Sequence, residues 1–188
     1  MVIRVQKEKP TQTLNFQKHH VQDYQRQEPH HRQGTEVHRN HHHTDRINLF
    51  RAVMRRIDLI VVHCSATRCN RPFPVTALIR CHANRFGFTG YHYYITRDGT
   101  TYQTRHEQLV GAHAKGYNSH SLGVCYEGGY DEQGRVADTR TAAQKKALLK
   151  LLKKLKAEHP QAEIVGHRDL PGVKKACPCF NAAEEYKN

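Results

Sequence analysis

Three residues of metal-ligating type follow short apolar runs of the chain. His63 closes the run 57–62, His167 follows the run 162–166, and Cys177 lies shortly beyond it. Two imidazoles and a thiolate are a common donor set for a tetrahedral zinc ion whose fourth position stays open to water. An open position is typical of catalytic zinc rather than structural zinc. The residue types therefore indicate a catalytic zinc centre, provided that folding brings the three together.

A second thiol competes for the third ligand position. Cys179 lies two residues after Cys177, and the residue types alone leave both as candidates. A redox or second-metal role for this pair is less favoured, because a single intervening proline gives awkward geometry for a bridge. Cys64 points away from His63 if their strand is regular, so we expect it to be a buried apolar thiol rather than a ligand.

The elements that must position these residues begin with three apolar strands. The nearly continuous apolar run 57–63 predicts a central strand that is buried on both faces. Residues 162–166 predict a strand that delivers His167, and residues 122–126 predict another that ends before the glycines at 128–129. The candidate ligands then stand at the ends of strands.

A hairpin and a helix lie between these strands. Residues 91–97 alternate as a strand, Asp98-Gly99 is a strong hairpin signal, and the return strand begins at Thr100. A helix opens at Phe73-Pro74, carries apolar residues at three- and four-residue spacing, and stops at Gly87.

A second helix completes the pattern. Thr141 and Gln144 match a capping box, and an apolar stripe follows it. The stripe consists of Leu148, Leu151, Leu152 and Leu155. Because hairpin and crossover signals both occur, we predict an α/β fold with a single domain, in which helices flank a central mixed β-sheet.

Composition separates residues 1–53 from the rest. That segment holds half of the 16 histidines, many Gln and Arg, few apolar residues and no Cys. Burial of so little apolar surface cannot offset the ordering entropy, so we predict a disordered segment before one catalytic domain at 54–188. The tract at 41–43 is interpreted as an adventitious metal binder. Met54 is a natural start for the domain, which suggests that residues 1–53 lie upstream of the native chain.

The formal net charge of +13 is not confined to that segment, because residues 54–188 carry 21 Lys and Arg against 12 Asp and Glu. The positive electrostatic field of so basic a domain favours binding to nucleic acid or to an anionic cell envelope. No helix-turn-helix, finger or basic-aromatic single-strand motif occurs, so we expect no specific nucleic-acid partner. Neither a membrane span nor a secretory signal is evident. We expect a monomer, cytoplasmic as synthesised, with free thiols or metal ligands rather than a disulfide framework.

Five separated motifs occur in an order that resembles a known family. They are 63–67 (HCSAT), 90–95 (GYHYYI) with 97–99 (RDG), 110–118 (VGAHAKGYN), 121–125 (SLGVC) and 175–178 (KACP). Over residues 57–185 the chain is similar to the phage lysozyme-type N-acetylmuramoyl-L-alanine amidases. That family is itself similar to the peptidoglycan recognition proteins.

The resemblance implies a zinc hydrolase that cleaves the amide between N-acetylmuramic acid and L-alanine in peptidoglycan. It places His63, His167 and Cys177 on the zinc ligands, Tyr91 on the catalytic tyrosine and Lys175 on the catalytic lysine. Zinc in such a site polarises the scissile carbonyl and lowers the pKa of its water to about 7. Lys175 would stabilise the oxyanion, and Tyr91 would orient the water or assist proton transfer to the leaving amine.

Other residues have secondary or alternative roles. The resemblance places His113 beside the zinc, where we expect it to bind substrate. Lys115 and Asn118 are either ligands for the peptide's carboxylates or ordinary turn residues. Glu127 is an outside candidate for a general base, and Asp169 either orients the neighbouring imidazole or caps its loop.

Two further functional classes stay open beside an active amidase. A recognition module would hold muropeptides without cleaving them, and loss of a zinc ligand is its usual mark, yet none of the family's ligands is missing here. A regulatory partner of RNA polymerase is the other class, which the basic charge permits without indicating. We expect the enzyme to act on the cell wall after release, or on recycled wall fragments.

Overall fold

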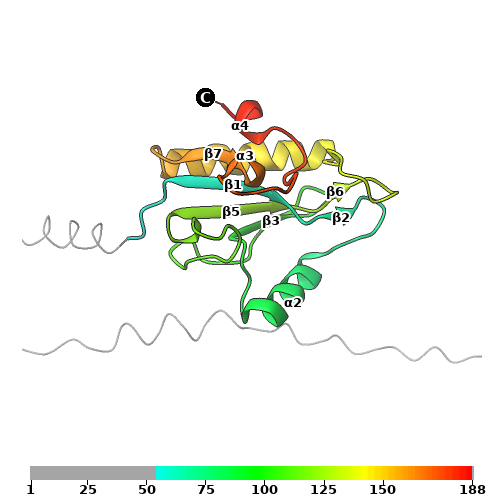
Figure 1. The fold of residues 1–188 in the computed structure, drawn as a ribbon, viewed down its shortest axis with the longest axis horizontal. Coiled ribbons are helices and arrows are strands. Elements are labelled where there is room, and N and C mark those ends of the chain that lie inside the picture. The colour runs from blue at the N-terminus through cyan, green and yellow to red at the C-terminus, as the bar shows by residue number, and fades with distance from the viewer. Residues whose placement is uncertain (1–53, 188) are drawn as a thin grey trace, which may run out of the picture. The chain divides into compact units, whose positions relative to one another are not determined.

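The computed structural model describes residues 54–187, and the predictions made for residues 1–53 lie outside this range. Five strands form one sheet in the order β4-β3-β5-β1-β7 (Figure 1). Four run parallel: β1 (Leu59–Cys64), β3 (Tyr93–Ile95), β5 (Ser121–Tyr126) and β7 (Glu163–Gly166). β4 (Thr101–Gln103) pairs antiparallel with β3. The prediction of a mixed sheet is confirmed.

Helices cover both faces of this sheet. Figure 1 shows α3 (Ala142–Glu158) on one side and α2 (Val75–Phe86) on the other. The Thr141–Gln144 capping box is present, and the four leucines of the predicted stripe are buried. They pack with Ile60, Val62 and Cys64 of β1, whereas Val61 belongs to a separate cluster. This alternation places His63 on the face of β1 opposite to α3.

The predicted hairpin and the predicted end of the helix at Gly87 are also confirmed, and the structure contains further short elements. Thr96 and Thr100 close the hairpin through a backbone hydrogen bond of 3.0 Å. The strand predicted at 91–97 is shorter, so Tyr91 lies just before β3. A two-stranded sheet, β2 (Thr67–Arg68) with β6 (Gly129–Tyr130), and a short helix α4 (Ala182–Glu185) were not predicted, because such short segments carry no periodicity.

Within residues 54–187, no helix combines the length and the apolar character that crossing a bilayer requires.

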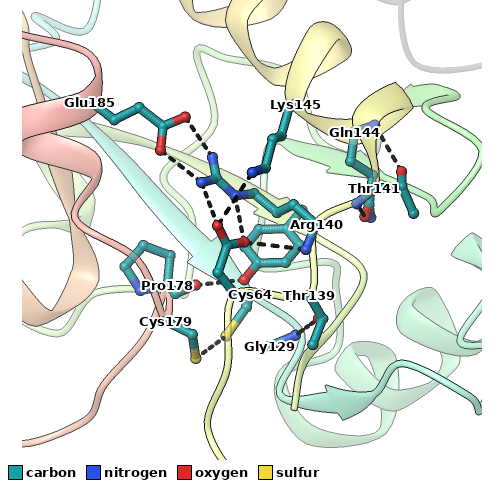
Figure 2. A network of polar contacts seen from close by, with 12 residues as sticks. Cys64, Gly129, Thr139, Arg140, Thr141, Gln144, Lys145, Pro178, Cys179 and Glu185 are labelled. Atoms are coloured by element: carbon teal, nitrogen blue, oxygen red, sulfur yellow. Dashed lines mark hydrogen bonds and ion pairs between the residues drawn. The ribbon is translucent and has the colours of Figure 1, made fainter. Parts of the chain in front are cut away.

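Arg140 fastens the C-terminal segment to the rest of the fold (Figure 2). Its side chain is only 1% exposed and pairs with Asp138 at 2.8 Å and Glu185 at 2.7 Å. Its guanidinium carbon lies 3.2 Å from the ring centroid of Phe180, close in sequence to Cys177. Hydrogen bonds from Arg140 lower the pKa of Glu185. Burial acts to raise the pKa of Asp138, but the hydrogen bonds and charge of Arg140 outweigh it and hold that pKa below its usual value.

We expect Arg140→Met to lower the free energy of unfolding at pH 7 by about 2–3 kcal/mol. This is less than for a fully buried pair, because both carboxylates keep contact with water. A carboxylate with a lowered pKa stabilises the fold above its unfolded pKa and loses that contribution as the pH falls through the folded pKa. The native protein should therefore lose stability between about pH 5 and pH 3, and the variant should lose less.

Urea denaturation across this pH range measures both effects. Arg135→Met is the matched control, because the Arg135 side chain is 76% exposed, against 1% for Arg140, and loss of its ion pair with Asp131 should change stability little. Equal destabilisation in the two variants would show that Arg140 contributes no more than a surface ion pair.

Candidate metal centre and active-site groove

His63, His167 and Cys177 come together where the parallel strands β1 and β7 end. Their donor atoms all lie within 4.8 Å of one another. The Sγ of Cys177 is 3.7 Å from Nδ1 of His63, and the two imidazole centroids are 4.5 Å apart. Zinc–nitrogen bonds of ~2.05 Å and zinc–sulfur bonds of ~2.3 Å separate tetrahedral N and S donors by about 3.6 Å. The donor types and their spacing therefore fit zinc.

Local structure explains how the two histidines are presented. His63 stands near the end of a buried strand and is 1% exposed. His167 opens a 3-10 turn, in which a carboxylate oxygen of Asp169 accepts the backbone N–H of Gly166 at 2.7 Å. Asp169 thus caps the loop, the second of its two predicted roles. Burial, together with the charge of Lys175, lowers the pKa of both imidazoles, so they are neutral near pH 7, the form that binds metals.

The two competing thiols occupy different places. Cys177 lies with the histidines, and its Sγ accepts the backbone N–H of Cys64 at 3.3 Å. Cys179 instead brings its Sγ to 3.5 Å from the Sγ of Cys64 (Figure 2). Cys64 is 4% exposed, as expected of a buried thiol. The geometry favours Cys177 as the third donor.

His113 contacts the ring nitrogen of His63 that is not directed toward Cys177. Nδ1 of His113 is 3.1 Å from Nε2 of His63, which leaves Nδ1 of His63 directed toward Cys177. A partner on the second ring nitrogen is the usual way in which a metal-binding histidine is held in one tautomer and orientation. Burial lowers the pKa of His113 to about 3, so the ring is neutral. A Cβ at Gly123 would lie 2.6 Å from this ring, so the close approach requires glycine.

Arg55 clamps the loop that carries His113. Its guanidinium donates to the carbonyl oxygens of Glu107 at 3.1 Å, Asn118 at 2.8 Å and Ser121 at 3.1 Å. The side-chain oxygen of Asn118 accepts the backbone N–H groups of His113 and the following residue at 2.9 and 2.8 Å. Asn118 thus has the turn role considered for it. Sequence reasoning missed Arg55, because no local pattern links it to a loop more than 50 residues away.

A basic groove of about 640 Å³ runs beside the candidate metal centre. Its lining includes His113, His167, Lys115, Lys174 and Lys175, with Arg85 from α2. Both predicted groove residues, His113 and Lys175, therefore face the same space as a candidate ligand. Such a concentration of cations favours an anionic or carboxylate-bearing substrate.

Tyr91 lies against the other side of His63. Their ring centroids are 5.0 Å apart, and the tyrosine ring is also 4.9 Å from that of His82 on α2. Burial raises the pKa of Tyr91, so its phenol is protonated at neutral pH. A protonated phenol can donate a hydrogen bond, and the ring that carries it packs against His63.

Glu127, the outside candidate for a general base, and His92 both have structural roles. Glu127 is 4% exposed, and its carboxylate accepts the backbone N–H groups of Phe73 at 2.6 Å and Arg97 at 3.1 Å. It anchors backbone rather than facing the groove. Nδ1 of His92 accepts the N–H of Gly123 at 3.0 Å, which is a structural role.

Comparison with known proteins shows which proteins this chain resembles in sequence and fold. The sequence pattern of the N-acetylmuramoyl-L-alanine amidase family matches residues 53–180. An endolysin of Klebsiella phage KP32 is 42% identical over 123 residues, which are 65% of this chain and 80% of that protein. An endolysin of Escherichia phage T7 is 41% identical over 125 residues, or 66% of this chain and 82% of that protein.

A solved structure shows the same fold. The N-acetylmuramoyl-L-alanine amidase LysC from Clostridium intestinale URNW matches with a TM-score of 0.58 and 29% identity. The match covers 71% of this chain and 83% of the clostridial chain. Both sequence and fold thus lead to the same group of proteins.

Proposed function

Because this chain belongs to the N-acetylmuramoyl-L-alanine amidase family and is an endolysin-type peptidoglycan hydrolase, we propose that its activity depends on a zinc ion held by His63, His167 and Cys177. The observation that carries the proposal is the convergence of their three donor atoms within 4.8 Å. A zinc ion held there would act as a Lewis acid and would lower the pKa of water bound to it, as hydrolysis of an amide at neutral pH requires.

The chain's own residues complete the chemistry. His113 fixes the tautomer of His63 through the 3.1 Å contact between their ring nitrogens. The protonated phenol of Tyr91 orients the reacting groups by hydrogen bonding and assists proton transfer to the leaving amine. Lys175, a cation on the groove, stabilises negative charge that develops on the carbonyl oxygen.

The groove supports binding of the peptide stem. The cations of Lys115, Lys174 and Arg85 line the same space as His113. Muropeptide stems carry carboxylates, and cations beside a groove attract such groups and fix their position. We assign residues 54–188 to the catalytic domain, acting as a monomer on the cell wall after release.

A recognition module that binds without cleaving is the second candidate function. It is less favoured, because the three candidate ligands are all present with converging donor atoms, Tyr91 packs against His63, and Lys175 lines the groove beside His167.

Release of L-alanine amino termini from purified peptidoglycan tests the proposed function. The protein loaded with one zinc per chain should release them, removal of zinc by a chelator should abolish release, and zinc added back should restore it. Zinc content measured in parallel separates loss of the metal from loss of the fold. One bound zinc with intact muropeptide binding and no release would instead support the recognition module.

A further inference from the structure

Two thiols outside the proposed zinc centre face each other across the fold. The Sγ atoms of Cys64, on β1, and Cys179, in the C-terminal segment, are 3.5 Å apart although 115 positions separate them in sequence (Figure 2). A disulfide needs the sulfurs about 1.5 Å closer. Cys64 is buried and Cys179 is partly exposed, so one member of the pair is accessible to a small reagent.

The backbone holds Cys179 in a conformation that favours glycine. Its φ is 71°, in the left-handed region that L-residues other than Asn and Asp rarely occupy. The N–H of Cys179 donates to the carbonyl of Ala176 at 2.6 Å, and the carbonyl of Pro178 accepts the hydroxyl of Tyr126 at 2.6 Å. A cysteine at a backbone position that favours glycine suggests that its side chain has a role that glycine could not perform.

Gly129 leaves the space in which the two sulfurs meet. A Cβ at this residue of β6 would lie 2.5 Å from the Sγ of Cys64 and 3.3 Å from the Sγ of Cys179. Three separate observations therefore concern the same small volume: the positive φ of Cys179, the absence of a side chain at Gly129, and the contact between the two sulfurs.

We propose that Cys64 and Cys179 are a modification site, which a small disulfide such as oxidised glutathione converts into an intramolecular disulfide while Cys177 is spared. The partly exposed Cys179, as its thiolate, attacks one sulfur of oxidised glutathione and forms a mixed disulfide, releasing one reduced glutathione. The Cys64 thiolate then attacks the Cys179 sulfur, closes the bond and releases the second glutathione. Two electrons and two protons pass from the protein thiols to the glutathione pair.

The bond would lock the folded form without occupying the proposed metal ligands. Cys64 follows His63 and Cys179 lies just beyond Cys177, so the bond would tie together the two segments that carry these ligands. Closing so long a loop restricts the unfolded chain strongly. We expect the oxidised protein to melt roughly 10 °C higher than the reduced protein.

The test uses the full-length, zinc-loaded protein in a series of buffers with an increasing ratio of oxidised to reduced glutathione. After alkylation of the remaining thiols, mass spectrometry should find the tryptic peptide 57–68 linked to the peptide that begins at Ala176. Fragmentation between Cys177 and Cys179 should place the link on Cys179, with one zinc per chain retained. Cys64→Ala and Cys179→Gly should each remove the link and the rise in melting temperature, whereas Cys81→Ser, on the exposed face of α2, should keep both.

Three results would overturn the inference. One is a link from Cys64 to Cys177 accompanied by loss of zinc. Another is accumulation of Cys179 capped by glutathione with no internal link. The third is a rise in melting temperature that persists in Cys179→Gly. Because the map of linked peptides does not depend on catalysis, these results leave the proposed amidase function to its own test.

Discussion

Cys177→Ala is expected to abolish stoichiometric zinc binding and to reduce amide hydrolysis by at least roughly 1000-fold. The reason is the geometry of the donor set, since the Sγ of Cys177 lies 3.7 Å from Nδ1 of His63 and within 4.8 Å of the donor of His167. Without this thiolate only two protein donors remain, fewer than the three that a catalytic zinc site normally has.

Cys179→Gly is the matched control, measured in reducing buffer. It removes the neighbouring thiol and relieves the positive φ of 71°, so the protein should fold, retain one zinc per chain and hydrolyse peptidoglycan. Zinc per chain after dialysis and release of amino termini are the two measurements. A Cys177→Ala protein that keeps its zinc, together with a Cys179→Gly protein that loses it, would move the ligand to Cys179.

The sequence was most informative where chemistry and periodicity coincide. The apolar run before His63 predicts a strand buried on both faces, and the run before His167 predicts a strand that delivers this histidine. Both strands are present and run parallel. Parallel strands end at the same edge, so the meeting of the two histidines follows from the fold class. The capping box of α3 was predictable for a similar reason, because its signal lies within four consecutive residues.

The sequence was uninformative where distant residues meet by close packing. Nothing near Arg55 indicates that it clamps the loop of His113, and nothing near Gly123 indicates an imidazole lying against it. The contact between Cys64 and Cys179 likewise depends on how the C-terminal segment passes the end of β1. Such contacts depend on the packed three-dimensional path of the chain, which residue spacing does not encode.

Tyr91→Phe is expected to lower kcat by about 100- to 1000-fold while leaving one zinc bound per chain. The substitution keeps the ring, which lies 5.0 Å from that of His63, and removes only the hydroxyl. If this hydroxyl hydrogen-bonds the reacting groups, kcat should fall with little change in KM, because ground-state binding in the groove is untouched.

Tyr94→Phe separates this effect from simple destabilisation. The buried hydroxyl of Tyr94 donates to the carbonyl of Phe73 at 2.7 Å, so its loss should lower stability by about 1 kcal/mol and leave kcat unchanged. Urea denaturation and steady-state kinetics on both variants test the contrast. If Tyr91→Phe keeps the kcat of the native enzyme, the phenol has no part in the reaction. Proton transfer to the leaving amine must then come from another group beside the metal centre. Lys175, which lines the groove and also carries a transferable proton, is the first residue to test for that role.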